Sequence, residues 1–213
     1  MVNSTDTDQF EYYLSSLDEL GEILIEADKI ESVASGILRL TLGTIMASNG
    51  AIFIFHKEDT SISELCSIGI NNNSKSIKLS DSFLVNIKVY QYGVLNFDKQ
   101  PDWIEGDFKK YLAKSSIKTI IPLFHKNRLL GILCVGEKFM SEIFTNIDYK
   151  ILEIISNHLT KSLFNYELIQ NVEEKYHLAA SFQKTIEDIL CDCLLYTSPS
   201  PRDATLSRMQ SSA

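Results

Sequence analysis

Residues 119–136 contain the pattern that most limits the folds open to this chain. Two apolar runs, TIIPLF and LLGILCVG, are separated by the polar residues HKNR. Apolar runs of this length joined by a short polar turn are typical of two paired β-strands that are covered on both faces. Pro122 cannot donate to a neighbouring strand, so we expect it where its nitrogen faces away from a partner or next to a bulge. The pattern therefore predicts a β-hairpin.

A long helix is expected directly after this hairpin. Thr145 is a good N-cap, and Asp148 three residues later completes a variant of the capping box. Phe144 and Tyr149 occupy the two positions of a hydrophobic staple. No glycine or proline interrupts the following sequence before Pro199. A hairpin followed by an uninterrupted helix predicts a compact unit of mixed α and β structure.

Two stretches carry apolar residues at alternating steps of three and four, which is a narrow helical seam of the coiled-coil type. The first lies before a break near Asp28, and the second extends to Leu190. The seam residues are Leu17, Leu20 and Leu24 in the first stretch, and Ile169, Val172, Tyr176 and Ile186 in the second. We expect such helices to pair across a homodimer or to couple one domain to the next.

The residues between the two stretches predict further elements. In chain order these are a helix over 30–46 that stops at Ser48-Asn49-Gly50, a strand over 51–55, a partner strand over 62–68, a helix after Ser80, a strand over 93–97 and a helix from Pro101 to Leu112. The glycine at the end of the first helix is expected to use its tolerance of positive φ.

Composition excludes several classes of function. The formal net charge of −8 argues against nucleic acid as a partner, because phosphate binding needs a basic surface. No apolar run approaches the roughly 18 residues that a membrane span requires, so we expect no membrane insertion. The N-terminus is polar and acidic, unlike a secretory signal, which favours the cytoplasm.

The chain lacks the common catalytic and metal-binding motifs. GxGxxG, GxxxxGK[ST], HExxH and GxSxG are all absent. The four histidines are scattered along the sequence, and the four cysteines do not have metal-type spacing. We therefore assign no catalytic residue and no metal ligand, predict that the protein is not an enzyme, and leave any cofactor unknown.

Three segments together resemble the GAF domain, a small sensory module of bacterial signalling proteins. They are SNGAIFIF (residues 48–55), TIIPLFHKNRLLGILCVG (119–136) and FTNIDYKILEIISNHLTKSLFNYELI (144–169). The resemblance covers about residues 17–170. It implies an α+β fold, with a GAF- or PAS-like antiparallel sheet that carries the first and last helices on one face. On the other face, the segments between residues 71 and 116 would wall a small-molecule pocket.

The candidate pocket residues are mostly aromatic. They are Phe53, Phe55, Tyr90, Phe97, Trp103, Ile104, Tyr111 and Ile121. Phe53 and Phe55 lie one alternation apart in a strand, so they share a face of the sheet. A filled hydrophobic core is the simpler interpretation for any one of these residues.

The domain organisation follows from these patterns. We expect an N-terminal helix extension over residues 1–16, the GAF-like domain over 17–170, a coiled-coil linker helix over 171–190 and a disordered tail over 191–213. Residues 193–213 of this tail, CLLYTSPSPRDATLSRMQSSA, resemble translated sequencing-adaptor read-through, and a native Ser/Pro-rich tail is the alternative. If it is read-through, the gene continues past about Leu190 into an output domain.

The resemblance predicts a sensory module, and three specialised types of GAF domain fit poorly. Residues 98–116 contain no cysteine or histidine to hold a bilin, and the NKFDE-type signature of cyclic-nucleotide binders is absent. Cys66 and Cys134 do not match the cysteine pattern of methionine-sulfoxide-reducing members. We predict a cytoplasmic module that binds a small molecule or mediates dimerisation and signals through its last helix. The alternatives are a free methionine sulfoxide reductase and a ligand-free dimerisation module.

Overall fold

The computed structural model describes residues 29–71, 76–90, 93–97, 101–139 and 143–197, with side chains described up to residue 190. The chain divides into two compact units, one ending at Tyr166 and the other starting at Glu167. The N-terminal extension and the seam residues Leu17, Leu20 and Leu24 lie outside the described residues, as do residues 198–213 of the tail.

The first unit is built on an antiparallel sheet. Its strand order is β3-β2-β1-β6-β5-β4. The strands are β1 (Gly50–His56), β2 (Ser61–Ile68), β3 (Ile77–Lys78), β4 (Leu95–Asn96), β5 (Ile117–His125) and β6 (Arg128–Gly136). The hairpin predicted from residues 119–136 is confirmed as β5 and β6. The pairing of β5 with β4 ends at Ile120, so Pro122 has no β4 partner, and a bulge follows Leu123. Both features suit a residue that has no backbone N–H to donate.

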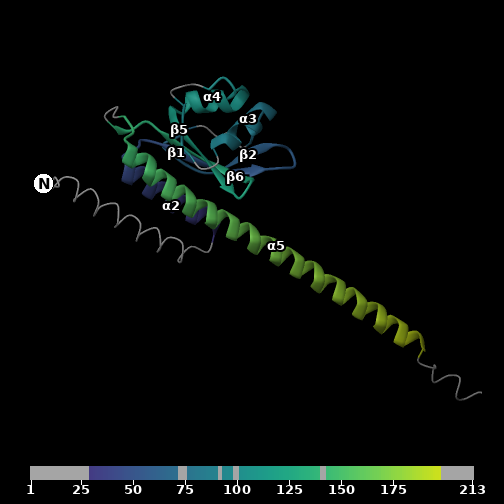
Figure 1. Ribbon diagram of the computed structural model, residues 1–213. Helices are drawn as coiled ribbons and strands as arrows, with labels where there is room; N and C mark the ends of the chain where they lie inside the picture. The colour runs from purple at the N-terminus through teal and green to yellow at the C-terminus, as the bar shows by residue number, and fades with distance from the viewer. Residues whose placement is uncertain (1–28, 72–75, 91–92, 98–100, 140–142, 198–213) are drawn as a thin grey trace, which may run out of the picture. The chain divides into compact units, whose positions relative to one another are not determined.

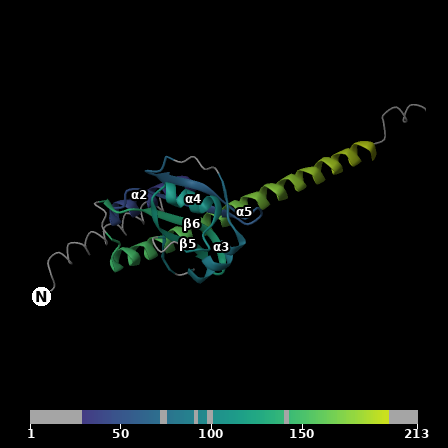
Figure 2. The ribbon, with the colours of Figure 1, turned by 90° about the horizontal axis from the view of Figure 1, so that it is seen from above.

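Helices cover both faces of this sheet (Figure 1). One face carries α2 (Ile30–Ile45) and the first part of α5 (Asn146–Thr197). The other carries α3 (Asp81–Asn86), the 3₁₀ turn η1 (Ile87–Tyr90) and α4 (Gly106–Lys114). Viewed from above, α3 and α4 lie over the strands (Figure 2). The predicted α+β architecture is therefore confirmed.

The sheet separates two hydrophobic clusters because successive residues of a strand point to opposite faces. On β1, Ile52 packs into the cluster under α2 and α5, whereas Phe53 packs into the cluster under α3 and α4. Both side chains are fully buried. This explains why β1 reads as a continuous apolar run rather than as an alternating one.

The start of α5 is held as its sequence predicts. The Thr145 backbone N–H donates to Asp148 Oδ2 at 2.7 Å, and the Asp148 N–H donates to Thr145 Oγ1 at 3.2 Å. The rings of Phe144 and Tyr149 stack with their centroids 5.9 Å apart, which forms the predicted staple. Lys138, just after β6, adds a buried ion pair to Asp148 at 3.0 Å. These contacts attach the first turn of α5 to the end of the hairpin.

The end of α2 differs from the prediction. The left-handed residue is Met46, with φ of 55°, and Gly50 is the first residue of β1. Gly50 is needed for another reason, since a Cβ there would lie 2.9 Å from the carbonyl oxygen of Cys134 on the neighbouring strand. The glycine therefore allows close approach of two strands, and α2 ends at Ile45, one residue before its predicted end.

Several element boundaries also differ. No helix begins at Pro101: the chain makes a turn there, with Ile104 N–H donating to Pro101 O, and α4 starts at Gly106 with φ of 68°. The strand predicted over 93–97 is reduced to the two residues of β4. At the other end of the chain, α5 continues to Thr197, seven residues into the predicted tail, because residues 146–197 contain no glycine or proline.

Candidate functional site

Seven of the eight candidate pocket residues lie in or against the hydrophobic cluster under α3 and α4. They are Phe53, Phe55, Tyr90, Phe97, Trp103, Ile104 and Tyr111. Phe53 meets Tyr111 edge to face with ring centroids 5.2 Å apart, and Tyr90 stacks on Trp103 at 5.9 Å. Phe53, Ile104 and Tyr111 are buried, whereas Tyr90 and Trp103 are half-buried. The structure therefore brings these seven together, with the partly accessible rings at one edge.

Two aromatic residues that were not among the candidates belong to the same cluster. Phe83 from α3 and Phe108 from α4 are both buried, with ring centroids 5.3 Å apart. Phe108 also meets Phe53 edge to face. The fold thus places Phe108 beside Phe53, and Phe83 against Phe108.

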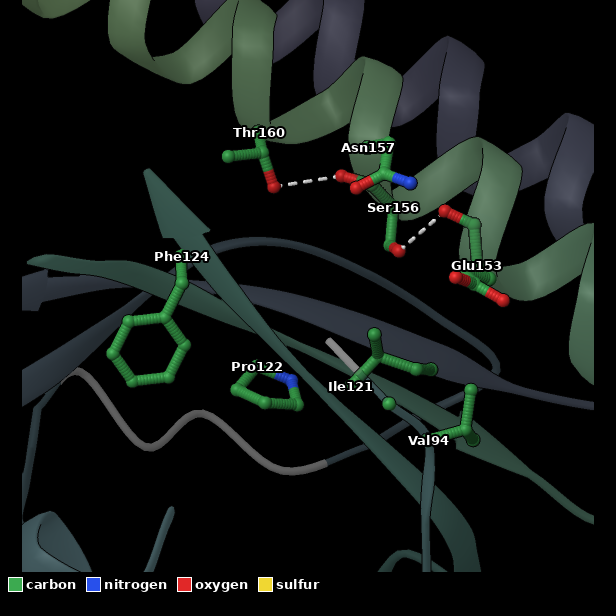
Figure 3. Close-up of a pocket in the computed structure, with 9 residues that line it drawn as sticks. Val94, Ile121, Pro122, Phe124, Glu153, Ser156, Asn157 and Thr160 are labelled. Carbon is green, nitrogen blue, oxygen red and sulfur yellow. Dashed lines mark hydrogen bonds between the residues drawn. The ribbon is translucent and has the colours of Figure 1, made fainter. Parts of the chain in front are cut away.

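Ile121 lies on the opposite face of the sheet, in the cluster under α2 and α5. It lines a small cavity between β5, the segment before β4 and the part of α5 in the first unit (Figure 3). The cavity has a volume of about 80 Å³. That space holds roughly five water molecules. Ile121 therefore cannot share a pocket with the other seven candidates.

The walls of this cavity differ in polarity. The strand side is apolar, with Ile121, Pro122 and Phe124, and the helix side carries polar groups of α5 (Figure 3). Two of these groups already have partners within the helix: Ser156 Oγ donates to Glu153 O at 2.9 Å, and Thr160 Oγ1 donates to Ser156 O at 2.7 Å. The cavity suits a few ordered waters better than a ligand, because known ligand pockets are several times larger.

A group of polar side chains lies beneath α4, on the same face as the aromatic cluster. Glu64 on β2 is directly opposite Phe53 on β1. Tyr111 on α4 contacts Phe53, and Ser115, the residue that follows α4, donates its N–H to the Tyr111 carbonyl oxygen. Glu64 Oε2, Tyr111 Oη and Ser115 Oγ are buried, and the Tyr111 hydroxyl interacts with the Ser115 and Glu64 side chains. Sequence patterns did not identify this group, because a single glutamate in a strand carries no signal of its own.

The electrostatics of this face favour protonated groups. Burial raises the pKa of the Tyr111 phenol, and the nearby Cys134 and Glu64 side chains raise it further. Burial also raises the pKa of the Cys134 thiol. On the opposite face of the sheet, the Cys66 thiol has its pKa raised to about 12, chiefly by burial and then by the charge of Glu64. Both thiols are therefore held in the weakly nucleophilic form at neutral pH.

These pKa shifts predict a loss of stability in alkali. Both thiols ionise near pH 9 in the unfolded chain, but the folded protein keeps them protonated, so above pH 9 the unfolded state binds fewer protons. The free energy of unfolding should then fall by up to about 1.4 kcal/mol per pH unit for each thiol. Urea unfolding at pH 8 and pH 10.5 measures this. A Cys66→Ala, Cys134→Ala double variant should lose less stability over the same range, and an equal loss would contradict the assignment.

The second unit presents the predicted seam on the part of α5 after Tyr166. Ile169, Val172, Tyr176 and Ile186 are 54%, 59%, 72% and 57% exposed in the single chain. The buried stripe of Leu152, Ile155, Leu159 and Leu163 lies in the first unit. Contiguous exposed apolar surface of this kind marks sites at which proteins interact.

The residues that the structure describes carry neither a metal-binding group nor a membrane-spanning helix. They contain no group of three or more histidine, cysteine, aspartate or glutamate side chains placed to hold a metal ion. Among the same residues, no helix combines the length and the apolar character needed to cross a bilayer.

Comparison with known proteins identifies the fold. No family model matches the sequence, and no curated protein matches it. The GAF domain of a phosphoenolpyruvate-protein phosphotransferase from Coxiella burnetii superposes with a TM-score of 0.61 at 14% identity, over 76% of this chain and 98% of that one. A bacteriophytochrome from R. palustris gives a TM-score of 0.61 at 11% identity, over 93% of this chain and 45% of that one.

A third similar structure is an enzyme. The free methionine-R-sulfoxide reductase from Neisseria meningitidis, solved with its substrate, gives a TM-score of 0.54 at 13% identity, over 71% of this chain and 87% of that one. Identities this low establish the fold and leave the function open. The fold expected from the three sequence segments is confirmed.

Proposed function

Because the chain has the GAF fold, we propose that it is a cytoplasmic sensory module rather than an enzyme. It binds a small molecule on the face beneath α3 and α4, pairs with a second copy through α5, and passes its state along α5 to an output domain. Signalling sensors are among the structures that share this fold, which supports the general class.

The single observation that carries the proposal is the exposed apolar seam of α5. Residues 169, 172, 176, 179, 183, 186 and 190 follow each other at alternating steps of three and four, the spacing of a two-helix coiled coil. The large side chains among them are more than half exposed in the single chain. A second copy covers them most simply, because the seam then meets an identical seam and closes with two-fold symmetry.

One polar residue in the seam supports pairing in a defined register. Gln183 occupies a position between Ala179 and Ile186, where every other large residue of the seam is apolar or aromatic. A buried amide at such a position finds a partner only when it faces its own copy, so it selects one alignment of the helices. The seam is therefore suited to a specific dimer with a fixed register, through which a change in the domain can be transmitted.

The buried thiols support a non-enzymatic role. A sulfoxide-reducing GAF protein needs reactive thiols with a lowered pKa, whereas burial raises the pKa of both Cys66 and Cys134. The rival function would be supported if the protein reduced free methionine sulfoxide and a Cys66→Ser, Cys134→Ser variant lost that activity.

The oligomeric state in solution tests the proposal. Sedimentation equilibrium of the chain is expected to give a dimer at low micromolar concentration. A monomer at several hundred micromolar would overturn the proposed signalling route, because α5 would then have no partner through which to report.

A further inference from the structure

The outward side of α5 within the first unit carries apolar side chains that the described residues leave uncovered. Ile147 and Ile154 are 47% and 42% exposed, and Ile151 between them is half-buried. Their steps of four and three place them along one side of the helix. Lys150 and Lys161, both exposed, lie on the same side. This surface, which we call the outer α5 face, is therefore apolar and basic.

The end of α2 extends the outer α5 face. Met46 and Phe139 are 61% and 60% exposed, and the Phe139 N–H donates to the Met46 carbonyl oxygen at 2.8 Å. This contact holds the end of α2 beside the segment that leads into α5. Both helices also pack into one hydrophobic cluster on the same side of the sheet, where they lie next to each other (Figure 1). The two helices therefore run in opposite directions.

The N-terminal residues 1–28, which lie outside the described residues, have a composition that complements this surface. They contain eight acidic and no basic residues, which equals the whole net charge of −8, so residues 29–213 carry no net charge. The same segment contains an apolar seam at residues 10, 13, 17, 20, 24 and 27. An acidic segment with an apolar seam matches an apolar and basic face in both charge and polarity.

The length of the segment also fits the surface. Lys29 is extended, with φ of −128° and ψ of 141°, so α2 does not continue backwards through it and the chain can turn there. A helix over residues 10–27 would rise about 26 Å, and α2 with its 16 residues rises about 24 Å. A helix that turns back before Lys29 therefore runs antiparallel to α2, in the direction of α5, and reaches the level of Met46 and Phe139.

We propose that residues 10–27 fold back as a helix onto the outer α5 face of the same chain. The apolar seam covers the isoleucines, with Leu17 near Ile154, and the two lysines attract the acidic residues of the segment. This inference goes beyond the proposed function, because it assigns the N-terminal extension to the first unit. The seam of α5 after Tyr166 is then the surface left for a second copy.

Disulfide formation in the full chain tests the proposal. The native cysteines are first removed, with alanine at residues 66 and 134 and serine at residues 191 and 193. On mild oxidation, Leu17→Cys with Ile154→Cys should form a disulfide within one chain, at least tenfold faster than Glu19→Cys with Ile154→Cys, because Glu19 lies outside the seam. Non-reducing denaturing electrophoresis and tryptic mapping identify the product. Covalent dimers would show that a second copy covers the face, and equal rates would show no specific docking; either result overturns the proposal.

Amide hydrogen exchange provides a second measurement that needs no cysteine. Exchange of residues 10–27 should be slowed at least tenfold relative to an unstructured peptide, independently of protein concentration. Lys150→Glu with Lys161→Glu should weaken this protection at least threefold. Lys57→Glu with Lys88→Glu makes the same change in charge at exposed positions elsewhere and should not weaken it. Absent protection, protection that rises with concentration, or equal effects of the two variants would overturn the proposal, even if the cysteine variants fail to fold.

Discussion

Replacing Val172 and Ile186 together with aspartate should convert the protein from a dimer to a monomer. Both residues lie in the α5 seam and are 59% and 57% exposed in the single chain, so neither supports the fold of the first unit. In the paired state the double variant would bury four carboxylates, each costing several kcal/mol. The dissociation constant should therefore rise at least a hundredfold, which sedimentation equilibrium measures.

The matched control places the same two charges on the opposite side of the helix. Gln170 and Ser181 are exposed and lie outside the seam, so a Gln170→Asp, Ser181→Asp variant has the same added charge and similar helix propensity. It should remain a dimer. If both double variants dissociate equally, the charge added to α5 is responsible and the seam is not the interface.

Replacing Asp148 with alanine should have the largest effect on the stability of the first unit. Asp148 Oδ2 accepts from Lys138 Nζ at 3.0 Å, from the Thr145 N–H at 2.7 Å and from Thr145 Oγ1 at 2.9 Å. The Lys138 and Asp148 side chains are only 9% and 4% exposed. Removing one partner leaves a buried charge without compensation and also removes the cap of α5, a loss of about 3–5 kcal/mol. Urea unfolding measures it.

An exposed ion pair provides the comparison. Asp107 and Lys110 on α4 lie 2.9 Å apart with side chains 78% and 80% exposed. Asp107→Ala should change the free energy of unfolding by less than about 1 kcal/mol, because exposed pairs contribute little. A Lys138→Met, Asp148→Leu double variant should recover part of the loss, since it removes both charges together. Equal effects at the buried and exposed pairs would show that the contacts of Asp148 do not hold α5 to the hairpin.

Features governed by local chemistry were predictable from the sequence. The capping pair Thr145 and Asp148 acts within one helical turn, and the predicted contacts are those observed. The β5–β6 hairpin was predictable for a similar reason, since its two apolar runs are separated only by HKNR and pair across that turn. The seven candidates, six of them aromatic, share one face because strand alternation and helical periodicity fix which way side chains point.

Features that depend on distant parts of the chain were not predictable. The need for glycine at position 50 comes from the carbonyl oxygen of Cys134, a residue on another strand. The face of the sheet to which Ile121 points depends on the register of β5, which the sequence does not show. The prediction that Ile121 lies with the pocket residues was therefore wrong. The position of Glu64 beside Phe53, Tyr111 and Ser115 could not be predicted, because only the fold brings these residues together.

Disulfide cross-linking along α5 tests the central claim most directly. In a chain with Cys66 and Cys134 replaced by alanine and Cys191 and Cys193 by serine, cysteine is introduced at one position at a time. In a parallel, in-register pair, Val172→Cys and Ile186→Cys bring two thiols within disulfide distance, whereas Gln170→Cys and Ser181→Cys hold them apart. Our account predicts covalent dimers on mild oxidation for the first two variants only. Cross-linking that is equal at all four positions, or absent from the seam, would contradict it.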